Sequence, residues 1–89
     1  MASKQQTKLI KIWQNKGYEV INIVSASRSF YPDLIATKPG HTVFIESKEK
    51  WDKLSEGQKI KARQLIKQGF EFYLNEKKYI PTIEKTDLF

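Results

Sequence analysis

Residues 32–48, PDLIATKPGHTVFIESK, contain two apolar, β-branched runs that meet at a Pro-Gly pair. The pattern predicts a β-hairpin whose strands cover about residues 33–37 and 42–48. If the strands close symmetrically about Pro39-Gly40, Asp33 lies directly opposite Glu46. Lys48 follows Glu46 by two positions, so both side chains point to the same face of the strand. A proline before glycine favours a type II turn and leaves a longer loop open; a three-residue loop would shift the pairing by one.

Two facing carboxylates destabilise each other unless a cation lies between them. Asp33 and Glu46, with the backbone carbonyl of Ser47 as a further oxygen, suit Mg²⁺, which prefers oxygen ligands and keeps several waters. Such an ion polarises a scissile phosphate and lowers the pKa of a bound water, while Lys48 can position that water or stabilise charge on the phosphate. The plainer alternative is a strand start at Asp33 and a solvated edge at Glu46 and Lys48. The apolar neighbours of these acids argue against it, because an unpaired charge among them is costly.

The residues before the hairpin predict one helix and one strand. The helix covers residues 3–16, with Ser3 as N-cap, Gln6 completing a capping box and Gly17 ending it. Its inward stripe has helical spacing and consists of Gln6, Leu9, Ile10 and Trp13. Residues 18–24, YEVINIV, are β-branched and partly alternating, which predicts a strand.

The residues after the hairpin predict a second helix and a last strand. Ser55 and Gln58 match a capping box at the start of a helix over about residues 55–68, and Gly69 ends it. The inward stripe of this helix is Ala62, Leu65 and Ile66. Residues 70–74, FEFYL, predict the last strand.

These elements predict one small α/β domain over residues 1–89. Their order is αβββαβ, with a core over about residues 3–75 and an uncertain C-terminal tail at 76–89. Apolar side chains occur on both faces of the hairpin strands, so we expect a mixed sheet flanked by helices on both sides.

Composition narrows the functional classes. The 89 residues suffice for a single core, and the net charge of +6 is compatible with a polyanionic partner. The chain contains no cysteine, which excludes disulfides and thiolate metal sites. No apolar run approaches the roughly 20 residues of a membrane span, and no signal-peptide core is evident. We therefore expect a cytoplasmic protein that is not secreted and does not bind membranes, with a virus or phage origin as one option.

The order and spacing of three motifs resemble a known nuclease family. These are the PD pair at residues 32–33, FIESK at 44–48 and LSEGQ at 54–58, followed by IKQGFEFYL at 66–74. Together they are similar to the virus-type replication-repair nuclease (VRR-NUC) group of the PD-(D/E)xK superfamily, and more loosely to Holliday-junction resolvases. The resemblance covers roughly residues 3–75.

The resemblance implies a restriction-endonuclease-like core and a site built from Asp33, Glu46, Lys48 and Gln58. Asp33 and Glu46 would hold Mg²⁺, with Mn²⁺ as a substitute, Lys48 would be the catalytic lysine, and Gln58 corresponds to the glutamine of the family. Gln58 is equally explained as the capping partner of Ser55. Members made of this domain alone tend to be homodimers that cut branched DNA.

Two positions depart from the family pattern. Relatives often carry a metal-assisting glutamate early in the first helix, whereas this chain has no acid before Glu19 and the equivalent place falls near Ala2 or Gln6. The metal site would then be completed by water or by a side chain such as Gln6. Relatives also tend to have a glycine shortly before the PD pair, where this chain has Phe30 and Tyr31. For these aromatics we favour a place in the core or in a dimer interface over stacking on a DNA base.

The leading hypothesis is a metal-dependent endodeoxyribonuclease selective for branched DNA. Two alternatives remain: a sequence-specific endonuclease of the homing or restriction type, and a degenerate nuclease fold that only binds DNA. Basic residues near the predicted site are the candidates for contacts with DNA phosphates. They are Arg28, Lys50, Lys53, Lys59 and Arg63.

Overall fold

The computed structural model describes residues 4–23, 30–49 and 52–81. The elements in chain order are α1 (Lys4–Asn15), β1 (Glu19–Asn22), β2 (Leu34–Lys38), β3 (His41–Glu46), α2 (Glu56–Lys67), β4 (Glu71–Leu74) and β5 (Lys77–Lys78). The strands form one mixed sheet in the order β1-β2-β3-β4-β5. Its strand pairs are antiparallel except for β3–β4, which is parallel. The predicted order αβββαβ is therefore confirmed, with one short strand added at the end.

The β2–β3 hairpin has the predicted symmetric register. Leu34 pairs with Ile45 and Lys38 pairs with His41, so only Pro39 and Gly40 remain in the turn. Gly40 adopts φ +73°, a left-handed conformation that glycine reaches without steric cost. The longer and three-residue loops are excluded, and the pairing is not shifted.

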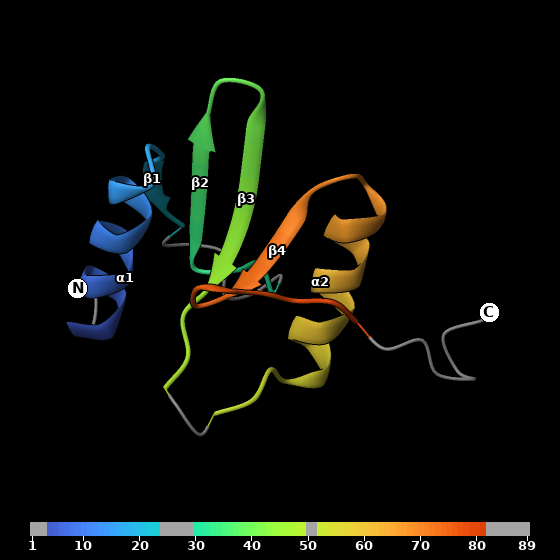
Figure 1. Ribbon diagram of the computed structural model, residues 1–89. Helices are drawn as coiled ribbons and strands as arrows, with labels where there is room; N and C mark the ends of the chain where they lie inside the picture. Colours follow the sequence, from blue (N-terminus) through green and yellow to red (C-terminus); the bar gives the residue numbers. More distant parts are fainter. Residues whose placement is uncertain (1–3, 24–29, 50–51, 82–89) are drawn as a thin grey trace.

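The two helices cover opposite faces of the sheet, with α1 on one side and α2 on the other (Figure 1). Alternate residues of each strand point to opposite faces, so each face has its own core. The core beneath α1 is formed by Leu9, Trp13, Leu34, Ala36, Val43 and Ile45. The core beneath α2 is formed by Phe44, Leu54, Ala62, Leu65 and Phe72. The expectation of a sheet covered on both sides is confirmed.

Both helices end as the sequence predicts. Gly17 follows α1 with φ +93°, and the backbone N–H groups after the helix return to carbonyls of its last turn. Gly69 follows α2 with φ +100°. The start of α2 carries the complete capping box of Ser55 and Gln58. The corresponding box of α1 involves Ser3, which lies outside the described residues, as do residues 25–29.

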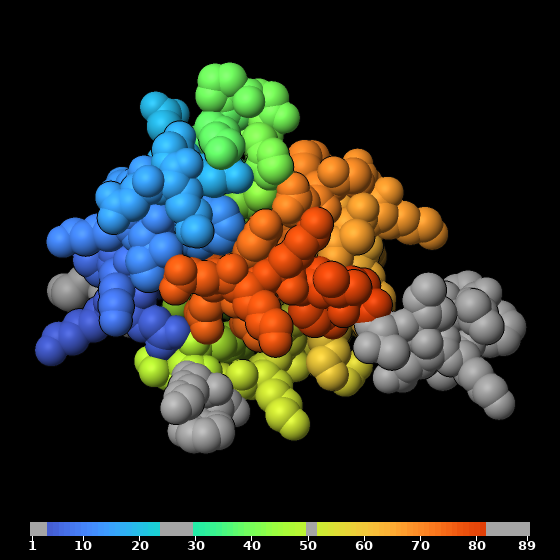
Figure 2. Space-filling view, in the orientation of Figure 1, coloured from blue at the N-terminus to red at the C-terminus, as the bar shows by residue number. Residues whose placement is uncertain are grey.

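The segment after β4 is more ordered than the sequence predicts. Asn75 has φ +58° and begins a turn that brings β5 back against β4 in antiparallel pairing. Tyr79 then packs against the core beneath α2, with its ring at 5.8 Å from that of Phe72. In the space-filling view this segment, coloured orange to red, lies across the molecule next to α1 (Figure 2). The fold therefore extends at least to Tyr79, beyond the predicted core boundary at residue 75.

Among the described residues, no helix is long and apolar enough to cross a membrane.

Candidate active site

Asp33 and Glu46 lie together at one end of the hairpin. Glu46 ends β3 and is only 4% exposed, while Asp33 directly precedes β2. The two side chains share a hydrogen bond, and Asp33 Oδ2 also accepts the backbone N–H of Ser47 at 3.0 Å. By strand alternation Glu46 lies on the same face as Phe44, beneath α2. The structure thus brings together the two carboxyl groups that the sequence places opposite each other.

The surroundings of Glu46 favour its protonated form. Burial, the hydrogen bond with Asp33 and the charge of Asp33, in this order, raise the pKa of Glu46 from 4.5 to about 8. The positive charge of Lys48 acts in the opposite direction. Ionisation of the buried Glu46 carboxyl beside the half-buried Asp33 is unfavourable, so Glu46 holds a proton at neutral pH.

This pair fits a hard divalent cation. The cation would replace the proton on Glu46, and carboxylate oxygens are its preferred ligands. Asp33 and Glu46 are the acids available; the described residues contain no group of three or more acidic or histidine side chains that could hold a metal ion. Water and backbone oxygens such as the Ser47 carbonyl would therefore complete the coordination.

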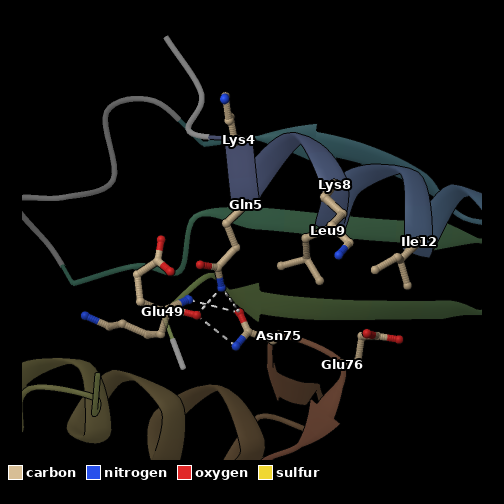
Figure 3. A pocket seen from close by; sticks show the side chains of 9 residues that line it. Lys4, Gln5, Lys8, Leu9, Ile12, Glu49, Asn75 and Glu76 are labelled. Atoms are coloured by element: carbon tan, nitrogen blue, oxygen red, sulfur yellow. Dashed lines mark hydrogen bonds between the residues drawn. The ribbon is translucent and has the colours of Figure 1, made fainter. Parts of the chain in front are cut away.

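Lys48 is held through its backbone by two polar side chains that the sequence reasoning missed. Asn75 bonds to both the N–H and the carbonyl of Lys48, and the Gln5 amide of α1 also donates to that carbonyl (Figure 3). These residues border a groove of about 530 Å³ between α1 and the turn after β4. Asn75 follows the predicted last strand directly, and asparagine tolerates the left-handed backbone of such a turn. That is the one signal in the sequence that points to it.

Gln58 performs its capping role in the structure. Its Oε1 accepts the backbone N–H of Ser55 at 2.8 Å, and its own backbone N–H donates to Ser55 Oγ at 3.2 Å. The structural explanation of this residue is therefore confirmed, with Oε1 engaged at the helix start. The Nε2 group is the part of the side chain that is left for a role toward DNA or a bound water.

Two neighbouring glutamines of α1 make hydrogen bonds in different directions, and the role of Gln6 in completing a metal site stays a prediction. Gln6 donates to Asn22 Oδ1 at 2.9 Å and so turns toward β1. Gln5 instead contacts the end of β3, where it meets the Lys48 carbonyl. Neither side chain carries a negative charge, and the contacts of Gln5 are with the Lys48 carbonyl and Asn75 Oδ1.

Phe30 and Tyr31 are surface residues, which corrects the expectation that they lie in the core. They are 49% and 40% exposed. The Phe30 ring covers Gly57 of α2 so closely that an added Cβ would lie 2.6 Å from it. Lys61 Nζ lies 4.4 Å from the centre of the Tyr31 ring. The dimer-interface and base-stacking alternatives for the two aromatics stay predictions.

The predicted DNA-contacting residues are only partly described. Arg28 and Lys50 lie outside the described residues. Lys53 is exposed in the segment before α2, and Lys59 and Arg63 are half-buried on α2. Lys59 Nζ also lies 3.6 Å from Oε1 of Glu56, which is three residues earlier on α2. The three described residues thus lie on α2 or directly before it, on the side of the sheet that Glu46 faces.

Comparison with known proteins agrees with this geometry. A family model described as archaeal Holliday junction resolvase (Hjc) matches residues 2–80. A solved structure described as a VRR_NUC domain superimposes with a TM-score of 0.69 at 24% sequence identity, covering 82% of this chain and 84% of the other. A search of curated protein sequences finds no significant match. The structural match supports a small VRR_NUC-like nuclease fold, and the family match covers both helices and every strand.

Proposed function

The chain belongs to the archaeal Holliday junction resolvase (Hjc) family, and from this membership we propose a metal-dependent endodeoxyribonuclease that prefers branched DNA. A nuclease of the resolvase type is the activity that the family assigns. The metal requirement and the preference for branched DNA are our proposals. The observation that supports the metal requirement is the buried Glu46 hydrogen-bonded to the half-buried Asp33, with its raised pKa, and the preference for branched DNA rests on the family membership.

Asp33, Glu46 and the Ser47 carbonyl are the groups that would hold Mg²⁺ or Mn²⁺. When bound, the ion supplies Lewis acidity toward the scissile phosphate and lowers the pKa of a coordinated water. Asp33 also fixes the chain by accepting the Ser47 N–H, which holds the hairpin end in place. Lys48 is close enough to Glu46 to affect its pKa, so its ammonium group can orient a water or stabilise negative charge on the phosphate. The Nε2 of Gln58 is a candidate donor to the same phosphate or water.

We also propose that the working unit is a homodimer. A symmetric cut of a four-way junction requires two active sites, and a two-fold pair of small domains supplies them economically. Lys53, Lys59 and Arg63 would then contact phosphates beside each site, together with Arg28 and Lys50.

A DNA-binding protein without catalysis is the second candidate. One observation favours it: the α1 side chain that reaches the end of β3 is the neutral Gln5, not an acid. Titration of the protein with Mn²⁺ by calorimetry separates the two candidates, because a pure binding module lacks a metal site that depends on Asp33. A sequence-specific endonuclease would reveal itself by cutting one sequence regardless of branching.

The central test is cleavage of four-way-junction, linear and supercoiled DNA with Mg²⁺ or Mn²⁺. We expect the wild-type protein to cut the junction fastest and EDTA to stop the reaction. Glu46→Ala should lower the rate by at least about 100-fold, since it removes a metal ligand. Glu19→Ala is the matched control, because it removes the same charge from an exposed position on β1 and should leave the rate unchanged. Intact DNA of all three kinds with wild-type protein and saturating metal would refute the proposal.

A further inference from the structure

The side chain of Asn75 makes a two-point contact with the backbone of Lys48. The Lys48 N–H donates to Asn75 Oδ1 at 2.9 Å, and Asn75 Nδ2 donates to the Lys48 carbonyl at 3.0 Å. The side-chain amide thus presents a donor and an acceptor to one residue, as a neighbouring strand would (Figure 3). Lys48 lies two residues beyond the end of β3, where strand pairing has stopped.

The Asn75 side chain bonds to Lys48 at the point where β4 no longer pairs with the chain that follows β3. Parallel pairing of β3 and β4 ends at Glu46 and Leu74, and the Asn75 N–H makes a last bond to the Glu46 carbonyl at 2.9 Å. Asn75 then adopts φ +58°, and the chain leaves toward β5. From this position the Asn75 side chain, in place of its backbone, makes the next two hydrogen bonds to the chain that follows β3.

The rest of the fold holds Asn75 in place. The Nε1 group of Trp13, which is 2% exposed, donates to the Asn75 carbonyl at 3.2 Å. Gln5 Nε2 lies 3.3 Å from Asn75 Oδ1 and also donates to the Lys48 carbonyl. Trp13 thus holds the backbone of Asn75 and Gln5 contacts its side-chain amide, so helix, turn and strand end meet at one cluster of hydrogen bonds.

We propose that Asn75 is a positioning residue for Lys48 in the cleavage reaction. In a strand, backbone N–H and C=O groups lie in the plane of the sheet and the side chain stands perpendicular to it. Holding both backbone groups of Lys48 therefore directs its ammonium group to the face that carries Glu46. Without the Asn75 side-chain amide, the backbone of Lys48 loses two hydrogen bonds, and its side chain can then turn away from the face that carries Glu46. The proposal rests on the nuclease function proposed above.

Asn75→Gly is the variant of choice, because glycine keeps the left-handed backbone and removes only the amide. We expect a 10- to 100-fold lower single-turnover rate on junction DNA, about the loss seen when the residues that orient a catalytic group are removed. The Kd for junction DNA in Ca²⁺ should stay within about twofold. Asn75→Asp, which keeps the acceptor but loses the donor, should also be slower. Val20→Ala, partly buried beneath α1 and remote from Lys48, is the control for a general loss of stability.

The decisive comparison uses Lys48→Ala as background. If Asn75 acts through Lys48, Asn75→Gly causes no further loss of rate there, because residues acting as a unit are not additive. Amide hydrogen exchange provides a readout that needs neither metal nor DNA: the Lys48 N–H should exchange at least about tenfold faster in Asn75→Gly, with the Val43 N–H unchanged. Wild-type rates in Asn75→Gly, an equal further loss in the Lys48→Ala background, or unchanged exchange at Lys48 each overturn the assignment. In these cases the nuclease proposal stands; a wild-type protein that cuts nothing refutes both.

Discussion

At the scale of single residues, the position of Glu46 in the hairpin determines the protonation of its carboxyl group. Its carboxyl group is placed by strand register next to Asp33 and is buried by the core beneath α2, and both effects favour its protonated form. A charged pair in this place is stable only with a compensating cation. Protonation of Glu46 and the proposed binding of a cation would each remove the repulsion between the two carboxylates.

The raised pKa of Glu46 predicts how the metal-free protein responds to pH. Between 4.5, its ordinary value, and about 8, the folded state binds more protons than the unfolded state. Stability that is present at the acidic end of this window is therefore lost as the pH rises through it. We expect the contribution of Glu46 to fall by on the order of 1 kcal/mol per pH unit within the window.

Thermal unfolding in EDTA at several pH values checks this prediction. Glu46→Gln removes the titrating group and should flatten the dependence between pH 5 and 8. Saturating Mn²⁺ should also flatten it, since the metal takes the place of the proton. A slope that is identical in Glu46→Gln and wild type would show that another group is responsible.

At the scale of elements, the start of α2 is fixed by its capping box. Ser55 and Gln58 satisfy each other's backbone N–H groups, which fixes where the helix begins. The adjoining Leu54 anchors this start in the core beneath α2. Helix capping therefore fixes Gln58 Oε1, and any role of its Nε2 toward DNA is a proposal.

Substitutions at Gln58 separate its two roles. Gln58→Ala should lower the free energy of unfolding by about 1 kcal/mol through loss of the capping box. Gln58→Glu retains a side chain able to cap and should recover most of that stability. If Nε2 contacts phosphate or a bound water, Gln58→Glu stays slow in junction cleavage although it is stable. Recovery of both stability and rate would reduce Gln58 to a capping residue.

At the scale of the whole molecule, a net charge of +6 is spread over a small domain whose proposed ligand is a polyanion. Lys53 is exposed before α2, on the side of the sheet that the carboxyl pair faces, whereas Lys11 is exposed on α1, on the other side. Binding of a polyanion releases counterions, so affinity falls steeply with salt.

Salt titrations of junction binding can locate the DNA-facing side. Lys53→Ala should reduce the slope of log Kd against log salt by about 1, as expected for the loss of one phosphate contact. Lys11→Ala changes the net charge equally and should leave the slope nearly unchanged. Equal effects of the two substitutions would mean that charge acts only through the overall field of the molecule.

Much of the fold and the carboxyl pair follow from local patterns. Several features depend only on residues a few positions apart and can therefore be predicted from the sequence. They are the glycines after both helices, the capping box of α2 and the Pro-Gly turn. The hairpin register follows from the turn, and with it the meeting of Asp33 and Glu46. Alternation of apolar residues on both strand faces likewise predicts two helical layers.

The remaining features depend on contacts between distant segments. The helices, the strands before residue 75 and the facing acids could be predicted from the sequence, because they depend on residues close together in the chain. The return of β5 to the sheet, the exposure of Phe30 and Tyr31 and the contact of Gln5 with the Lys48 carbonyl depend on long-range packing. The same holds for Asn75 and Lys48, which are 27 residues apart. Their hydrogen bonds require that β3 and β4 pair side by side, so a local sequence pattern does not predict the contact.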